Sequence, residues 1–188
     1  MKFCRDFLKI GKKCVLADIH FGLLKLVDRE LVEKISRLAS EYEEVIVAGD
    51  LKHLGKKFNF KLSSNVLLVK GNHDAKINAE KIVFVKKFAI FHGHFIPREA
   101  LDYKKWITGH IHPAIYLNET KEKVFLLGKN KEREILVLPA FNELCSSTAV
   151  NIRKPDSKIF KNFSEWFVIS DNLFLDLESL TTSSSFSF

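Results

Sequence analysis

Apolar, β-branched runs that end in metal-binding residue types constrain this sequence more than any other feature. Such runs occupy residues 14–17, 45–48, 66–69, 88–91 and 106–108, and histidine, aspartate or asparagine follows each of them closely. Short runs of nearly continuous apolar residues are typical of strands buried on both faces. Because ligands bind beyond the carboxyl ends of strands in open α/β sheets, we expect these polar residues to face one site.

The remaining pattern predicts an α/β fold. Further strands are expected at residues 82–85, 114–117, 124–127 and 135–138. Apolar residues from Leu26 to Ala39 recur at helical spacing and predict an amphipathic helix over residues 28–42, with Asp28 as its N-cap. A strand, a helix and a second strand imply a right-handed parallel crossover. The second half has less helix and more strand, which indicates a mixed sheet or a second sheet.

One domain accounts for most of the chain. No linker rich in proline, glycine or serine interrupts the first 178 residues of the 188, so we expect a single domain over residues 1–178. Residues 166–169 and 173–177 flank Ser170-Asp171-Asn172 and predict a closing hairpin. The serine- and phenylalanine-rich tail, residues 179–188, is expected to be disordered.

Composition excludes several classes of protein. The longest apolar runs are far too short to cross a bilayer, and charge interrupts the first six residues, so we expect a cytoplasmic protein with no membrane contact. Three cysteines without a Cys-x-x-Cys pair argue against a disulfide framework and against a thiolate zinc site. The net charge of +7 suits either a polyanionic partner or a lysine-rich, solvated surface.

Histidine dominates the motifs at the strand ends. The motifs are Asp18-Ile19-His20, Gly49-Asp50, Gly71-Asn72-His73-Asp74, His92-Gly93-His94 and Gly109-His110-Ile111-His112. Each motif alone is a weak signal, since glycine, asparagine and aspartate also suit ordinary turns. Together, imidazoles, carboxylates and an amide are the ligands that two adjacent divalent cations need, which points to hydrolysis at phosphorus.

The ordered motifs resemble those of the calcineurin-like metallophosphoesterase superfamily, from Asp18 to His112. The segment from Ala17 to Gly22 is similar to the small, uncapped prokaryotic phosphoesterases, including those encoded beside DNA ligases and helicases. It is more distantly similar to exonucleases that repair double-strand breaks. Residues 138–142 also resemble a stretch of the small branch, although Ser146-Ser147 stands where glycine is expected. The resemblance implies a two-sheet β-sandwich of mixed sheets flanked by helices.

The resemblance also implies roles for individual residues. The first metal would be held by Asp18, His20 and His112, the second by Asn72, His92 and His110, and Asp50 would bridge them. A water bridging the cations would be acidified towards hydroxide and attack phosphorus in line. His73 would act as a catalytic acid on the leaving oxygen, and Asp74 would orient His73. This ligand set suits two divalent ions, of which manganese is expected first, with iron, zinc, cobalt or nickel as alternatives.

Substrate contacts are less determined by the sequence. His53 either touches substrate phosphate or caps a turn, and His94 either supports the ligand His92 or exchanges roles with it. Lys52 and Arg98 are further candidates for phosphate binding. The basic and aromatic residues 52–61 suit single-stranded nucleic acid, or equally Phe58 and Phe60 belong to the core.

The sequence therefore predicts a metal-dependent phosphodiesterase that acts on a phosphate ester, with nucleic acid or a nucleotide as candidate substrates. A phosphomonoesterase or nucleotide phosphatase is the alternative, because the metal chemistry barely distinguishes diesters from monoesters. A metal-binding scaffold that has lost turnover is a third reading. Homodimers occur among the proteins that the chain resembles, but no stretch of this sequence marks an interface.

Overall fold

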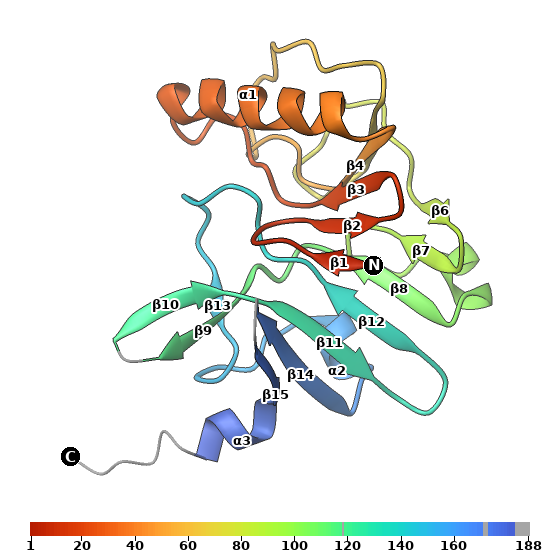
Figure 1. Ribbon diagram of the computed structural model, residues 1–188, viewed down its shortest axis with the longest axis vertical. Helices are drawn as coiled ribbons and strands as arrows, with labels where there is room; N and C mark the ends of the chain where they lie inside the picture. Colours follow the sequence, from red (N-terminus) through yellow and green to blue (C-terminus); the bar gives the residue numbers. More distant parts are fainter. Residues whose placement is uncertain (118, 171–172, 183–188) are drawn as a thin grey trace.

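Two sheets carry the fold, and the computed structural model describes them over residues 1–117, 119–170 and 173–182 (Figure 1). The first sheet contains, in spatial order, β1 (Lys2–Phe3), β2 (Leu8–Ile10), β3 (Lys13–Leu16), β4 (Glu44–Ala48) and β5 (Val66–Val69). The strands β3, β4 and β5 are parallel, and the others pair antiparallel. Helix α1 (Lys25–Glu41) makes the crossover from β3 to β4 and lies outside this sheet.

The second sheet is larger and also mixed. It contains, in spatial order, β15 (Leu173–Asp176), β14 (Glu165–Ser170), β11 (Phe125–Lys129), β12 (Glu134–Val137), β8 (Lys105–Thr108), β7 (Phe88–Ile90) and β6 (Val83–Val85). Its central strands β7, β8 and β12 are parallel. A small third sheet contains β10 (Thr120–Lys123), β9 (Pro113–Leu117) and β13 (Thr148–Ala149).

Alternating burial explains why the strands are apolar throughout. Ile46 on β4 packs between the two sheets, in one cluster with Ile107 and Leu136 of the second sheet. Its neighbours Val45 and Val47 point the other way and pack in the cluster that includes Leu31 and Ile35 of α1, together with Leu38. Both faces of β4 are therefore covered, and burying each such side chain contributes about 1.5–3 kcal/mol.

The other helices in the described part of the chain are short. They are η1 (Arg98–Asp102), a 3-10 helix, and the α-helices α2 (Lys158–Lys161) and α3 (Leu177–Thr182). No helix in the described ranges has both the length and the apolar character needed to span a bilayer.

The strand assignments and the parallel crossover are confirmed, whereas the start of the long helix is not. Helix α1 begins at Lys25, and Leu24 occupies its N-cap without a side-chain cap. Asp28, the expected N-cap, lies in the first turn and accepts a hydrogen bond from the backbone N–H of Gly22 at 2.8 Å. Its carboxylate therefore binds the loop that precedes the helix and does not cap the first turn.

Near the end of the chain the expectations are partly confirmed. Strands β14 and β15 form the expected antiparallel hairpin, whose residues 171–172 lie outside the described part of the chain. Disorder from residue 179 onward is wrong for residues 179–182, because α3 continues to Thr182. The rest of the expected tail, residues 183–188, lies outside the described residues.

The carboxyl ends of the parallel strands in the two sheets meet at one end of the sandwich. An isolated parallel bridge between Ala17 and Ala140 joins the extension of β3 to the extension of β12. The backbone N–H of Phe141 adds a hydrogen bond of 2.8 Å to the carbonyl of Ala17. The loops that leave β3, β4, β5, β7 and β8 are therefore brought together at this end.

Candidate metal centre

Backbone hydrogen bonds fix the loops that carry the polar motifs. The N–H of Asp18 donates to Gly49 at 3.0 Å, and the N–H of His20 donates to Asp50 at 2.9 Å. In the second sheet the N–H of Gly109 donates to His92 at 3.0 Å. These bonds continue the strand pairing past the formal ends of the strands, so the loops are rigid platforms for the side chains that they carry.

Left-handed backbone is concentrated in these loops. The φ angles are 59° at Asp18, 49° at His20, 54° at Asp50, 72° at His110 and 49° at His112. Residues with a Cβ atom rarely adopt this conformation, which costs about 1–2 kcal/mol each. The tight packing of the two sheets holds the chain in this conformation and turns the side chains inward.

Asp18, His20 and His112 form the first group of donors. Their ligand atoms all lie within 4.8 Å of one another. Nε2 of His112 is 3.2 Å from Oδ1 of Asp18 and 3.4 Å from Nε2 of His20. The carbonyl of Ser146 accepts from Nδ1 of His112 at 2.8 Å, which directs Nε2 at the other two donors.

Asn72, His92 and His110 form the second group. Nδ1 of His92 donates to the carbonyl of Ala48 at 3.0 Å, and Nε2 lies 3.1 Å from Oδ1 of Asn72. The ring of His110 lies with its centroid 5.0 Å from that of His92. The backbone N–H of His110 donates to Oδ2 of Asp18 at 3.0 Å, which joins the second group to the first.

Asp50 lies between the two groups. Its Oδ2 is 3.2 Å from Nε2 of His92 and 3.7 Å from Nε2 of His20. Its Oδ1 accepts from the backbone N–H of His73 at 2.9 Å. One carboxylate oxygen therefore reaches both sets of imidazoles, as a bridging ligand must.

Electrostatics favours the forms that cations require at His20, His110, Asp18 and Asp50. Burial lowers the pKa of His20 to about 4 and, together with the charge of His92, the pKa of His110 to about 4. Burial acts to raise the pKa of Asp18, but His112 outweighs it and the pKa lies below its ordinary value. Asp50 shows the same balance, with His92 holding the carboxyl pKa well below normal. At the other two histidines burial opposes protonation, but Asp50 and Asp18 raise the pKa of His92 to about 9, and Asp18 raises that of His112 above its ordinary value. Neutral imidazole and ionised carboxylate are the forms that bind metal.

The donor set fits divalent cations. Oδ1 of Asp18, which faces Nε2 of His112, is buried without a hydrogen-bond partner among the described residues. Atoms bonded to one cation at about 2.1 Å lie about 3–3.4 Å from each other, which is close to the observed spacings within the two groups. Nitrogens that face each other at 3.4 Å, as in His20 and His112, are stabilised by a cation or a proton between them.

His73 lies beside both groups but makes different contacts. The backbone N–H of Leu54 donates to its Nδ1 at 3.1 Å, so the ring proton is on Nε2. That Nε2 lies 4.0 Å from Oδ2 of Asp50, and the ring centroid is 4.9 Å from that of His20. His73 therefore presents a proton donor to the same cavity that the expected metal ligands line.

A family model described as the calcineurin-like phosphoesterase superfamily domain matches residues 12–134. The chain belongs to this superfamily. Its members are phosphoesterases that use divalent metals, and the match includes all seven expected ligand positions. No curated protein matches the chain.

The chain is similar to several solved structures, of which the first has the same fold. The nuclease MPE of Pseudomonas putida has a TM-score of 0.56 at 19% identity, and the match covers 88% of this chain and 87% of that one. Yfce, a phosphoesterase from E. coli, has a TM-score of 0.43 at 16% identity and covers 86% and 90%. A predicted phosphoesterase of Streptococcus pneumoniae has a TM-score of 0.45 at 16% identity and covers 86% and 84%.

Asp74 binds backbone groups rather than the ring of His73 that it was expected to orient. Its Oδ2 accepts from the N–H of Gly71 at 2.9 Å and its Oδ1 from the N–H of Lys52 at 3.2 Å. Because Nδ1 of His73 already accepts from Leu54, it has no proton to donate to Asp74. Asp74 is buried and joins the turn after β5 to the loop after β4.

Lys52 is likewise occupied within the protein. The side chain is buried, and Nζ donates to the backbone carbonyl of His73 at 2.9 Å. Lys52 therefore fixes the backbone of His73, and its expected contact with substrate phosphate is not supported.

Of the other three candidate substrate residues, His53 lines the cavity, whereas His94 and Arg98 are not among the described residues that line it. The ring centroid of His53 is 5.8 Å from that of His20 and 5.6 Å from that of His73. His94 lies behind the ligands, with its ring 5.3 Å from that of His92, and His92 is the residue whose Nε2 reaches Asp50. Arg98 is exposed on η1.

Of the two phenylalanines after Asp50, Phe58 favours the core interpretation. Phe58 packs in the cluster beneath α1, with its ring 5.0 Å from that of the buried Phe21. Phe60 also lies against Phe21, at 5.6 Å, and its side chain remains partly exposed.

Sequence reasoning missed the loop that completes the cavity of about 460 Å³. Leu144, Cys145 and Ser146 line it, opposite His53 and His73. Asn142 holds this loop in place, because its fully buried side chain donates to the carbonyl of Ile19 at 2.9 Å. Burial raises the pKa of the Cys145 thiol to about 12, so without a metal ion this residue stays protonated. The one sequence feature that pointed to this loop was the similarity of residues 138–142 to the small, uncapped phosphoesterases.

Proposed function

We propose that this protein is a dinuclear metal-dependent phosphodiesterase that hydrolyses nucleic acid or nucleotide diesters. The position of Asp50 carries the proposal. One of its oxygens lies within 3.7 Å of both imidazole groups, and its other oxygen is hydrogen-bonded to the backbone of His73. A shared carboxylate of this kind suits two cations about 3.5–4 Å apart, the spacing at which a phosphate is clamped between them.

The donors would divide between two cations in the way that the sequence resemblance implies. Asp18, His20 and His112 would hold one, and Asn72, His92 and His110 the other, with Asp50 common to both. When bound, the metals supply Lewis acidity and an activated nucleophile at neutral pH. Nitrogen and oxygen ligands favour manganese, iron, zinc or cobalt over magnesium or calcium, and manganese is the first ion to test.

His73 supplies the proton that the leaving oxygen needs. Leu54 fixes the tautomer, so Nε2 carries a proton into the cavity, and Lys52 fixes the adjacent backbone. A positioned acid of this kind contributes about 10²–10⁴-fold to the rate. His53 lies beside it and is placed to contact a phosphate oxygen.

Two observations favour a diester. The cavity is an open cleft lined by several residues from both sheets, with room for groups on both sides of a phosphate. The chain carries a net charge of +7, which favours a polyanionic substrate. The likeness to the nuclease MPE concerns the fold and is compatible with this choice.

The test compares manganese-dependent hydrolysis of bis-p-nitrophenyl phosphate and p-nitrophenyl phosphate. We expect faster cleavage of the diester, loss of activity in EDTA and no activity in Asp50→Asn. Preference for the monoester would replace the proposal with a phosphomonoesterase. Two bound metals without turnover of either ester would point to a scaffold.

A further inference from the structure

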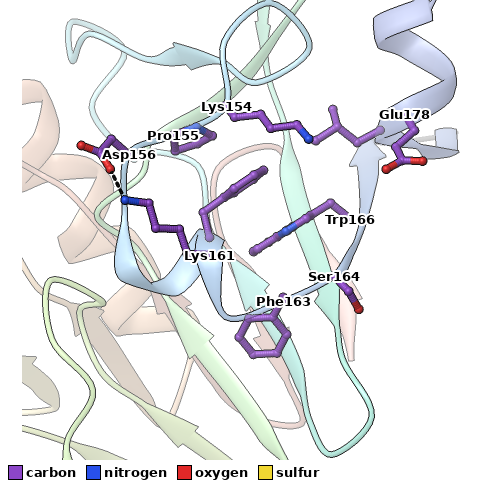
Figure 2. A pocket seen from close by; sticks show the side chains of 10 residues that line it. Lys154, Pro155, Asp156, Lys161, Phe163, Ser164, Trp166 and Glu178 are labelled. Atoms are coloured by element: carbon purple, nitrogen blue, oxygen red, sulfur yellow. Dashed lines mark hydrogen bonds and ion pairs between the residues drawn. The ribbon is translucent and has the colours of Figure 1, made fainter.

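A second cavity, of about 620 Å³, lies beyond the metal centre (Figure 2). Its apolar wall is aromatic, formed mainly by Phe160, Phe163 and Trp166. The rings of Phe160 and Trp166 stack with centroids 4.4 Å apart and planes at 5°. Figure 2 shows the ion pair of Lys161 and Asp156 at one end of the cavity and Glu178 at the other.

A smaller hollow connects this cavity to the metal centre. Its lining includes the expected metal ligand His110 at one end and Lys154 and Pro155 at the other. Lys154 and Pro155 also line the aromatic cavity, and His110 also lines the metal cavity. The three hollows therefore follow one another along the surface, and Arg153 lies in the connecting one.

Charge along this path favours an anionic ligand. Residues 153–161 contain four cationic side chains and one carboxylate, that of Asp156. Lys161 pairs with Asp156 at 2.6 Å, so these two charges neutralise each other, and Glu178 adds a carboxylate at the far end of the aromatic cavity. Among the described residues of the path, the unpaired cations are those of the connecting hollow. Arg153 and Lys154 are exposed. Both line the hollow between the metal cavity and the aromatic cavity.

Trp166 adds an unsatisfied polar group. Its side chain is 6% exposed, and Nε1 has no hydrogen-bond acceptor among the described residues. Buried indole N–H groups usually find a partner, and a nucleobase offers carbonyl and ring-nitrogen acceptors. Each of the nucleobases can also stack on an aromatic ring, so such stacking does not depend on the sequence of the strand.

We propose that the aromatic cavity is a subsite for an unpaired base of single-stranded nucleic acid, with Arg153 and Lys154 binding the phosphates between that base and the scissile bond. This assignment rests on the proposed phosphodiesterase function and specifies its substrate class. A duplex is disfavoured, because its bases are stacked and paired and cannot enter the cavity.

The first test measures the affinity of the full chain, in EDTA, for a fluorescein-labelled ten-residue oligothymidylate by anisotropy. The double variant Arg153→Ala/Lys154→Ala should raise Kd at least tenfold and reduce the salt slope by about 1.4, or about 0.7 per phosphate contact. The matched control Lys158→Ala removes an exposed cation from the same segment, outside these cavities, and should change Kd less than twofold. Equal effects of the double variant and the control would refute the subsite.

The second test concerns the base. An abasic strand of the same length should bind more weakly than oligothymidylate, and Trp166→Phe, which keeps the stacked ring but removes the N–H, should weaken oligothymidylate binding three- to tenfold. Equal affinity for the abasic strand, or tighter binding of duplex, would overturn the assignment.

Turnover separates the two proposals. The ratio of kcat/KM for the oligonucleotide to kcat/KM for bis-p-nitrophenyl phosphate should fall at least tenfold in Arg153→Ala/Lys154→Ala. An unchanged ratio with an active enzyme would refute the subsite alone. Absence of any diester hydrolysis by the unaltered protein would refute the phosphodiesterase function itself, whatever the strand-binding results.

Discussion

Gly49→Ala should separate metal binding from simple backbone strain. Gly49 has φ of +93°, and a Cβ atom there would lie 2.2 Å from Nδ1 of His92. His92 would have to move by more than about 1 Å to restore an ordinary contact distance. That movement breaks its 3.0 Å hydrogen bond to Ala48 and withdraws Nε2 from Asp50.

The expected magnitude follows from these two effects. Left-handed backbone costs alanine about 1–2 kcal/mol more than glycine, and the lost hydrogen bond adds about 0.5–1.5 kcal/mol. The free energy of unfolding should fall by about 1.5–3.5 kcal/mol, which lowers Tm by about 3–14 °C in a chain of this size. A displacement of about 1 Å at a ligand should also reduce kcat/KM by about 10²-fold or more.

The matched control is Gly55→Ala. Gly55 has φ of +74°, but a Cβ atom there would meet nothing within 4 Å. This variant should show the strain alone, about 1–2 kcal/mol, with both metals and full activity. Calorimetry, metal analysis by plasma mass spectrometry and diester hydrolysis would be measured on both variants. A Gly49→Ala protein that holds two metals at unaltered kcat/KM would refute the reasoning.

Four further predictions follow from the site. Asp50→Asn should lower the metal content as well as abolish turnover, and metal analysis would detect the loss. His73→Ala should retain both metals and lower kcat about 10²–10⁴-fold, most strongly for poor leaving groups; full activity on such a substrate would exclude the acid role. Asp74→Ala should lower the free energy of unfolding by about 2–5 kcal/mol, because two backbone N–H groups lose their acceptor, and denaturant unfolding would measure it. In EDTA, stability should decline between pH 6.5 and about 9: burial opposes protonation of His92, but Asp50 and Asp18 raise its pKa to about 9, so the stabilisation present below the ordinary value of 6.5 is lost as pH rises. A flat Tm profile over that range would contradict this balance.

The sequence predicted the elements and residues whose side-chain pattern repeats along the chain. Continuous apolar runs predicted β3, β4 and β5 because both faces of these strands are covered. The short strands β1, β2 and β10 were missed, since they contain lysine and are stabilised by pairing with their neighbours rather than by their own composition. The start of α1 was misplaced because Asp28 resembles a cap but bonds to Gly22.

The residues of the candidate site also fall into those that the sequence predicted and those that it did not. Its expected ligands come together because each follows a parallel strand, and parallel strands end on one side. The contacts of Asp74 and Lys52 could not be predicted, because both depend on how the turn after β5 packs against the loop after β4. The contribution of Asn142 and Ser146 depends on a return of the chain far along the sequence, which local patterns do not specify.

At the left-handed residues of the candidate metal centre, selection for stability and selection for metal binding favour different amino acids. Five non-glycine positions at about 1–2 kcal/mol each amount to about 5–10 kcal/mol, comparable with the entire stability of an ordinary domain. Glycine at Asp18, His20, Asp50, His110 or His112 would relax the backbone while removing a ligand. A descendant released from the need for metal should therefore accumulate glycine or asparagine at these positions first, and become more stable as its chemistry disappears.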